Sequence, residues 1–122
     1  VRPGLTVRLV GGRVRGRTQA VVDDWALRVL GDTYVDVAFI GTNGITVERG
    51  LTTPDPAEAA VKQAMLAAAR RVVVLADHTK VGATHFARFG DLREVAILIT
   101  DSGLDADVAA RLEAAGPTVV RA

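Results

Sequence analysis

The residues best suited to chemistry in this sequence follow an apolar run at residues 72–76. They are Asp77, His78, Thr79 and Lys80. A carboxylate here can accept from a ligand hydroxyl and an ammonium can meet a phosphate, which is the combination that phosphorylated polyols require. A solvated turn is the alternative interpretation. Only Lys62 and Lys80 among fifteen Lys and Arg residues are lysines, and this scarcity favours a role for the compact ammonium of Lys80.

A second cluster of small polar residues follows the apolar run 34–40. It consists of Gly41, Thr42, Asn43 and Gly44. Glycines allow the backbone to approach a ligand closely, while Thr and Asn add uncharged hydrogen-bonding groups. An ordinary turn after a strand explains the same residue types.

Thr52 and Thr53 are weaker candidates. They precede an expected helix, whose N-terminal amides could hold an anion. However, Asp55 is a good cap for that helix, and Glu58 with Lys62 forms an i,i+4 pair that stabilises a helix without any ligand.

Arg17 is the last of three arginines at a spacing of two residues. Together with Arg13 and Arg15, it would lie on one side of a strand. A solvated basic edge and a site that captures phosphate explain this pattern equally well.

Other kinds of site are not indicated. His78 and His85 have no histidine or cysteine at ligand spacing, so we expect no metal and no cofactor. No nucleophile elbow, Walker A loop or dinucleotide fingerprint is present. The net charge of +1 and the lack of an arginine-rich helix argue against direct DNA binding. The absence of cysteine and of a long apolar run predicts a cytoplasmic protein without a membrane span.

The elements that must position these residues alternate between strands and helices. Strands are expected at residues 5–10, 34–40, 72–76, 96–100 and 118–122. Helices are expected at residues 20–30, from a cap at Asp55 through Ala68, and at 105–115 with a stop at Gly116. Trp25 is expected in the core. This order predicts one α/β domain with a largely parallel sheet, whose ligands bind at the carboxyl ends of the strands.

Five stretches taken together resemble the C-terminal effector-sensing domain of DeoR-family bacterial transcription repressors. They are "LVGG", "DVAFIGTNG", "GLTTPDPAEAAVKQAM", "LADHTKVG" and "ILITD". The resemblance implies a fold similar to ribose-phosphate isomerases and glucosamine-phosphate deaminases. It also implies that the domain binds a phosphorylated sugar, which modulates DNA binding in carbohydrate metabolism.

The resemblance further implies that the domain is not an enzyme. The isomerases carry two catalytic aspartates where this sequence has Ile40 and Asn43, and neither side chain can act as a general acid or base. Asp77 and Lys80 match an aspartate and a lysine that both groups keep. We therefore expect no catalytic residues, and an effector site made of the candidates named above.

The family's domain normally begins with a strand, a phosphate-binding Gly-Thr-Thr loop and a helix that would precede Val1. Residues 1–122 are therefore expected to form a single partial sensing domain, with the DNA-binding helix-turn-helix further upstream. An unpaired sheet edge would favour a homo-oligomer. An isomerase-like or deaminase-like enzyme and a structural oligomerisation module are the alternative functions. The enzyme would need a carboxylate near Asn43, which Glu58 or Asp55 could supply in place of the missing aspartate.

Overall fold

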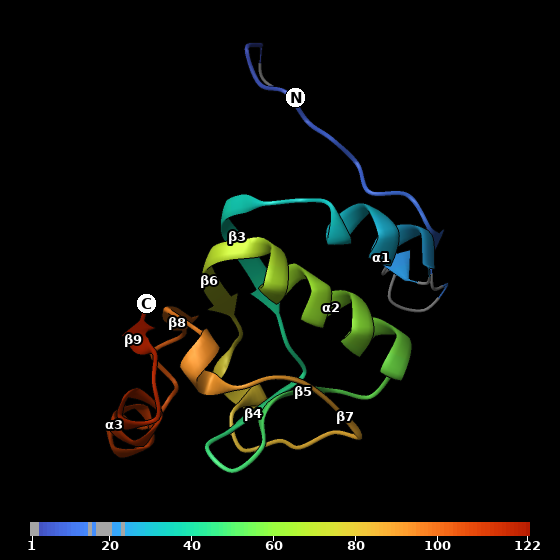
Figure 1. Ribbon diagram of the computed structural model, residues 1–122. Helices are drawn as coiled ribbons and strands as arrows, with labels where there is room; N and C mark the ends of the chain where they lie inside the picture. Colours follow the sequence, from blue (N-terminus) through green and yellow to red (C-terminus); the bar gives the residue numbers. More distant parts are fainter. Residues whose placement is uncertain (1–2, 15, 17–20, 23) are drawn as a thin grey trace.

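The computed structural model describes residues 3–14, 16, 21–22 and 24–122 (Figure 1). Its centre is a four-stranded parallel sheet. The strand order is β3 (Val35–Gly41), β6 (Ala69–Leu75), β8 (Ile97–Thr100) and β9 (Thr118–Arg121). The prediction of an α/β fold with a largely parallel sheet is confirmed, because all three strand pairs are parallel and α-helices lie in the connections from β3 to β6 and from β8 to β9.

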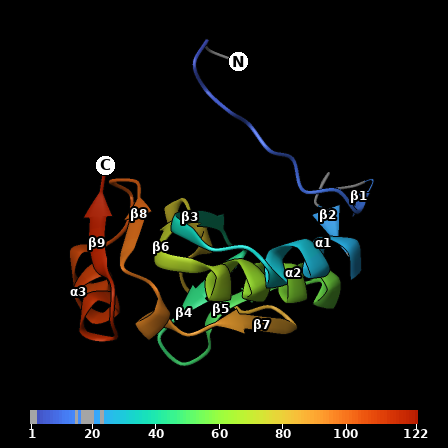
Figure 2. The ribbon, with the colours of Figure 1, turned by 45° about the horizontal axis from the view of Figure 1, so that its top comes forward.

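Three helices accompany the sheet: α1 (Asp24–Gly31), α2 (Pro56–Ala68) and α3 (Ala106–Ala114). α1 and α3 lie at opposite ends of the molecule in both views (Figures 1 and 2). The core forms where Ala38, Ile40 and Leu98 on one face of the sheet join Leu66 of α2 and Leu112 of α3. Alternation along each strand sends these side chains to the helical face.

The other face of the sheet carries exposed apolar side chains. Phe39 is 63% exposed, and Val37, Leu75 and Val120 are also exposed. Val37 and Phe39 share a face with Gly41, because alternate residues of a strand point to the same side. Gly41 pairs with Leu75, Leu75 with Ile99 and Ile99 with Val120, so the four apolar side chains lie on one face of the sheet. Within the described residues, no strand pairs with the outer edge of β3. This combination leaves an apolar face and an open edge side by side.

A second, antiparallel sheet was not expected from the sequence. It consists of β4 (Gly44–Thr46), β5 (Gly50–Thr53) and β7 (Ala87–Gly90). Gly50 has φ +72, and a Cβ there would lie 2.3 Å from the Gly90 carbonyl oxygen. The three strands are three or four residues long, and β4 and β5 consist largely of Gly and Thr, so their pattern resembles that of a loop.

Short elements complete the structure. They are strands β1 (Arg13–Val14) and β2 (Val21–Val22) and the 3-10 turns η1 (His78–Lys80) and η2 (Leu92–Glu94). No helix within the described part of the chain is long and apolar enough to cross a membrane.

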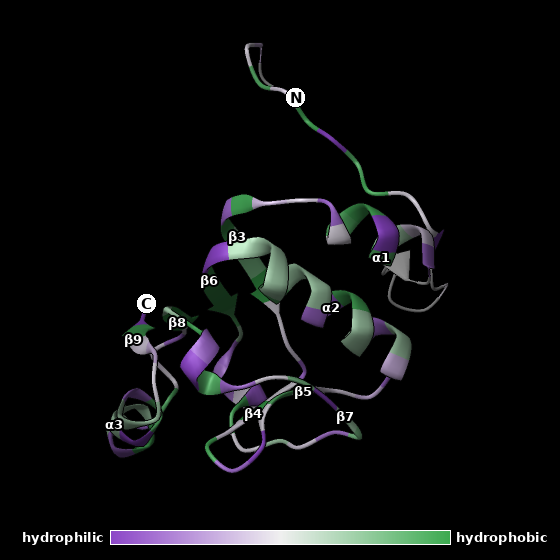
Figure 3. Cartoon of the chain, viewed as in Figure 1, coloured by the Kyte–Doolittle hydropathy of each residue, from purple (hydrophilic) through white to green (hydrophobic). Residues whose placement is uncertain are grey.

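The expected strand at residues 5–10 is wrong. These residues form an extended segment without strand pairing, and Leu9 is 92% exposed. Figure 3 shows the segment leading away from the body of the molecule with its hydrophobic residues in green. Alternating apolar residues are compatible with a strand, but a strand also needs a neighbour to receive its hydrogen bonds.

The expected core position of Trp25 is also wrong. Its side chain is 69% exposed, Val29 is exposed too, and the Arg28 guanidinium lies 5.8 Å from the Trp25 ring centroid. α1 begins at Asp24, later than the expected start at residue 20, and it turns Ala26 inward instead.

The remaining elements agree with the sequence. Asp55 caps α2, since its carboxylate accepts from the amides of Ala57 and Glu58 at 3.4 and 3.3 Å. Gly116 follows α3 with φ +154, at a position where a Cβ would lie 2.6 Å from the Leu92 carbonyl oxygen. Both residues act at the helix ends where the sequence placed them.

Candidate functional site

The candidate residues lie at one edge of the parallel sheet. Gly41 pairs with Leu75 and Leu75 pairs with Ile99, so β3, β6 and β8 end side by side. The segments that follow these strands, which begin at residues 42, 76 and 101, are therefore next to one another. The sequence predicted this common edge, which is where parallel α/β sheets bind ligands.

The Gly41–Gly44 loop is fixed against β5. The buried Thr42 hydroxyl lies 3.0 Å from the Gly44 carbonyl oxygen and 3.1 Å from that of Thr52, and both can accept from it. The backbone amide of Asn43 donates to the Thr52 carbonyl oxygen at 3.3 Å. A Cβ on Gly44 would lie 2.3 Å from the Ala83 carbonyl oxygen, so only glycine fits there.

Thr52 and Thr53 are joined to this loop and do not face the amides of α2. The Thr53 hydroxyl donates to Asn43 Oδ1 at 2.8 Å, with Glu58 Oε2 at 3.4 Å as a second acceptor. The Thr52 hydroxyl accepts from the His85 amide at 3.0 Å. The α2 amides are instead capped by Asp55, which disfavours an anion at that helix end.

His85 contacts the candidate loop, and the sequence did not predict this contact. One ring nitrogen, Nε2, lies 3.2 Å from the Asn43 carbonyl oxygen. His85 is far from Asn43 in the sequence, and the antiparallel sheet that joins them was itself not predicted. No spacing signal was available to find this contact.

Asp77 and Lys80 lie on the turn after β6. Asp77 Oδ1 accepts from the Thr79 amide at 2.8 Å and from the Thr79 hydroxyl. These hydrogen bonds, with a smaller contribution from nearby Lys80, hold the pKa of Asp77 below its usual value. Asp77 is therefore a carboxylate anion at neutral pH, able to accept from a ligand hydroxyl.

His78 and Asp101 join the ends of β6 and β8. The His78 amide donates to Asp101 Oδ1 at 2.6 Å, and His78 Nδ1 lies 2.7 Å from Asp101 Oδ2. The Gly103 amide donates to Asp101 Oδ2 at 2.9 Å. The hydrogen bond from the His78 amide is the main cause that lowers the pKa of Asp101 to about 2.

Two further charged residues lie beside the loop, on α2. The Lys62 ammonium donates to the Gly41 carbonyl at 2.7 Å, and Glu58 is buried near Thr53. From the sequence, their i,i+4 spacing was explained by helix stabilisation without a ligand.

Two further residues were singled out by the sequence: Arg17 as a candidate for the effector site, and Ile40 as the replacement of a catalytic aspartate of the isomerases. Arg17 lies outside the described residues. Ile40 is 1% exposed and packs in the core, so its side chain does not face the edge. No group of three or more His, Cys, Asp or Glu suited to a metal ion occurs among the residues that the structure describes.

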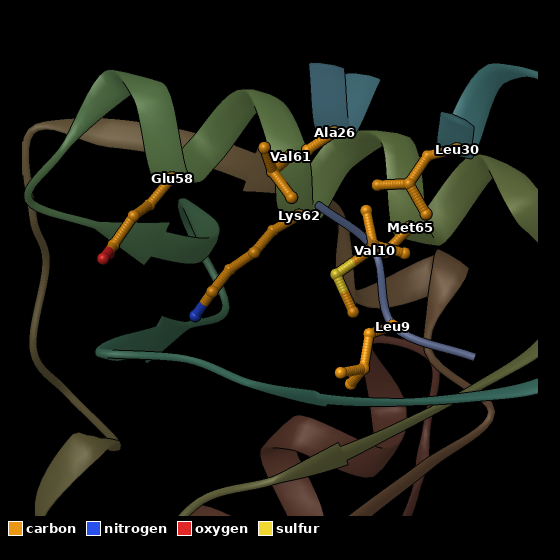
Figure 4. A pocket seen from close by; sticks show the side chains of 8 residues that line it. All are labelled: Leu9, Val10, Ala26, Leu30, Glu58, Val61, Lys62 and Met65. Atoms are coloured by element: carbon orange, nitrogen blue, oxygen red, sulfur yellow. The ribbon is translucent and has the colours of Figure 1, made fainter. Parts of the chain in front are cut away.

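A pocket of about 390 Å³ lies between α1, α2 and residues 9–10. Lys62, which contacts the last residue of β3, is part of its lining. Its lining is apolar except for Glu58 and Lys62 (Figure 4). An apolar wall does not suit a sugar, so the pocket alone does not identify a sugar site.

The sequence of the chain matches the DeoR C-terminal sensor domain over residues 1–102. The chain belongs to the DeoR family. It is 45% identical over 114 residues to the HTH-type transcriptional regulator GlpR of Haloferax volcanii, covering 93% of this chain and 45% of that protein. It is 34% identical over 100 residues to the HTH-type transcriptional repressor GlcR of Bacillus subtilis, covering 82% of this chain and 38% of that protein.

A third relative is the uncharacterized HTH-type transcriptional regulator FruR of Bacillus subtilis, at 37% identity over 102 residues. The match covers 84% of this chain and 41% of that protein. The chain thus spans less than half the length of these relatives. All three are regulators by name, and the prediction of a regulator that is not an enzyme is confirmed at the level of the family.

Proposed function

We propose that residues 1–122 form a single partial sensing domain that binds a phosphorylated sugar at the carboxyl edge of its parallel sheet. The observation that carries this proposal is the adjacency of two kinds of group. The uncharged, closely fixed Gly41–Gly44 loop follows β3, and the charged turn with Asp77 and Lys80 follows the neighbouring strand β6.

Each kind of group has a role that its chemistry supports. Asp77 accepts from a sugar hydroxyl, and the Lys80 ammonium contacts the phosphate. Gly41, where a Cβ would meet nothing within 4 Å, allows close approach of the backbone to the ligand. Gly44 packs against Ala83 and Thr52 and, with Thr42 and Asn43, keeps the loop in place. Thr52 and Thr53 support that loop from β5, and Arg17 is the weakest member of the proposed set.

The bound sugar acts on transcription by changing the relative populations of the conformations of the regulator. An effector that binds one arrangement of the regulator more tightly shifts the equilibrium toward it by the difference in affinity. DNA binding itself belongs to a helix-turn-helix outside these residues, in the part of the regulators that this chain does not span.

We also propose that the domain associates with a second copy of itself. The outer edge of β3 and the apolar face that includes Phe39 are adjacent and exposed, and such an edge is a template for pairing. Light scattering after size exclusion should give at least twice the mass of one chain. A monomer at high concentration would contradict this.

A thermal-shift screen of phosphorylated sugars tests the main proposal. The chain should be compared with a version extended at its N-terminus by the preceding segment of the Haloferax relative. A ligand at about 100 times its Kd stabilises by about 2.7 kcal/mol, so we expect a shift of roughly 10 °C in at least one of the two proteins. Fructose 1-phosphate is a suitable first probe, with fructose and inorganic phosphate as controls.

Two substitutions near β6 sharpen this test. Lys80→Met at the carboxyl edge should remove the shift, whereas Arg70→Met, which removes an exposed cation at the opposite end of β6, should retain it. If no sugar phosphate shifts either protein, the sensing proposal fails and a structural oligomerisation module is favoured. Conversion of the sugar by the wild-type protein would favour the enzyme alternative.

A further inference from the structure

Both lysines of this chain lie at the same edge of the sheet. Lys80 is on the turn after β6, and Lys62 reaches from α2 to the last residue of β3. There, its ammonium donates to the Gly41 carbonyl at 2.7 Å. The remaining Lys and Arg residues are arginines, so the two lysines of the chain belong to segments next to the ends of one pair of strands, β3 and β6.

Glu58 lies one turn before Lys62 and is only 7% exposed. Its Oε2 is 3.4 Å from the Thr53 hydroxyl, which also donates to Asn43 Oδ1 at 2.8 Å. The carboxylate of Glu58 is thereby coupled to the loop residue Asn43 through a single hydroxyl. A buried carboxylate in this position is costly unless charged or polar groups compensate it.

The pocket gives both side chains access to a ligand. Glu58 and Lys62 are the charged residues among those that line it. Figure 4 shows both side chains running from α2 in the same direction, with their charged ends away from Leu9, Leu30 and Met65. The pocket therefore has an apolar end and a charged end, and the charged end is the one near Gly41.

The ammonium of Lys62 retains capacity for a ligand. It has three N–H donors, and within the described residues its one hydrogen bond goes to Gly41, with the Phe89 ring centroid 5.4 Å away. Burial lowers the pKa of Lys62, while the nearby charge of Glu58 opposes that change. A partly desolvated cation gains more from an anionic ligand than a solvated one does.

We propose that Glu58 and Lys62 belong to the effector site, Lys62 as the contact to an anionic oxygen of a sugar phosphate and Glu58 as the acceptor for one of its hydroxyls. This inference rests on the proposed function. It adds two ligand contacts next to the end of β3 to those of Asp77 and Lys80 next to the end of β6. The competing explanation is structural, in which Lys62 only ties α2 to the end of β3.

Labelling of lysine amines with acetic anhydride, followed by mass spectrometry, separates these explanations. The protein has two lysines to compare, and the probes are fructose 1-phosphate and inorganic phosphate. The labelling is done on whichever of the two proteins in the thermal screen binds. At about ten times Kd, we expect modification of both lysines to slow by roughly tenfold.

The outcomes distinguish the two proposals. Protection of Lys80 without Lys62 overturns the present inference and leaves the sensing proposal intact. Thermal stabilisation without protection of Lys62 overturns it as well. If no sugar phosphate in the panel stabilises or protects either protein, the sensing proposal fails, and this inference fails with it.

Substitutions provide an independent readout. Lys62→Met and Glu58→Gln should each raise Kd for the bound sugar phosphate by roughly 10- to 100-fold, since each removes a hydrogen bond to a charged group. Gln63→Ala, on the exposed side of the same turn of α2, should leave Kd unchanged. A Lys62→Met variant that loses thermal stability but keeps its Kd within about twofold would show that Lys62 is only structural.

Discussion

The two halves of the candidate site end neighbouring strands but are built differently. The Gly41–Gly44 loop is held by hydrogen bonds to β5, ten residues away, and its partners Thr52 and Thr53 are buried. The turn after β6 is exposed, and the hydrogen bonds of Asp77 go to Thr79, two residues on. We call the first half, residues 41–44 with Thr52 and Thr53, the wall of the site, because it is largely buried and hydrogen-bonded. The second half, residues 77–80, is a charged turn in contact with solvent.

Under the proposed function, this difference indicates how ligand recognition is divided between the two halves. A buried, hydrogen-bonded wall sets the shape of the site before a ligand arrives, which lowers the entropic cost of binding. Exposed charged side chains supply attraction and can adjust to the ligand. We therefore expect substitutions in the first half to affect folding, and substitutions in the second half to affect binding.

The largest effect is expected for Gly44→Ala. The new Cβ would lie 2.3 Å from the Ala83 carbonyl oxygen and 2.6 Å from Thr52 Oγ1, and backbone atoms cannot move aside cheaply. The free energy of unfolding should fall by about 3 kcal/mol. Urea denaturation measures it, with Gly41→Ala as the control, because a Cβ on Gly41 meets nothing within 4 Å. Equal losses in both variants would show that the loop is not tightly packed.

A smaller loss is expected for Thr53→Val. The methyl group keeps the shape, but Asn43 Oδ1 loses its 2.8 Å donor and Glu58 loses a neighbouring hydroxyl. We expect the free energy of unfolding to fall by roughly 1–2 kcal/mol. Thr79→Val in the exposed turn provides the comparison and should cost less than about 0.5 kcal/mol. Similar costs at both positions would remove the distinction between wall and turn.

The smallest effect is expected for Asp101→Asn and concerns acid stability. The folded pKa of Asp101 is lowered from 3.8 to about 2, chiefly by the His78 amide. The unfolded chain thus binds more protons in this range, and the stabilisation present above pH 3.8 is lost as the pH falls to about 2. Asp101→Asn should flatten the fall in melting temperature across this range.

Exposed Asp36 on β3 offers a matched control, since Asp36→Asn also removes one carboxylate. If the two variants and the wild-type protein melt with the same dependence on pH, the hydrogen bonds to Asp101 do not stabilise the fold.

The parallel sheet was predictable because its strands carry their own signal. Val72, Val73 and Val74 are β-branched and buried, and no other element suits such a run. Asp55 and Gly116 mark helix ends by local chemistry, which needs no tertiary information. The positions of Asp77 and Asn43 then followed from the rule that parallel strands bind ligands at their carboxyl ends.

The antiparallel sheet and the exposure of Trp25 were not predictable in the same way. β5 reads Gly-Leu-Thr-Thr, and its residues are buried because other segments cover them, not because of their composition. Trp25 and Val29 lie on the same stripe of α1, but the helix turns the face with Ala26 inward and leaves that stripe exposed. His85 and Lys62 contact residues that are 42 and 21 positions away in the sequence. A local sequence pattern cannot reveal such contacts.

The antiparallel pairing of β4 with β5 also has a kinetic consequence. Only residues 47–49 separate β4 from β5. By contrast, each residue of β3 pairs with a residue of β6 that lies 34 positions later in the sequence. Short-range hairpins close in microseconds, and parallel pairings form more slowly because a longer loop must be ordered first. The contacts among Thr42, Asn43 and Thr52 are therefore expected early in folding, so the wall of the site would form before the sheet that carries the charged turn.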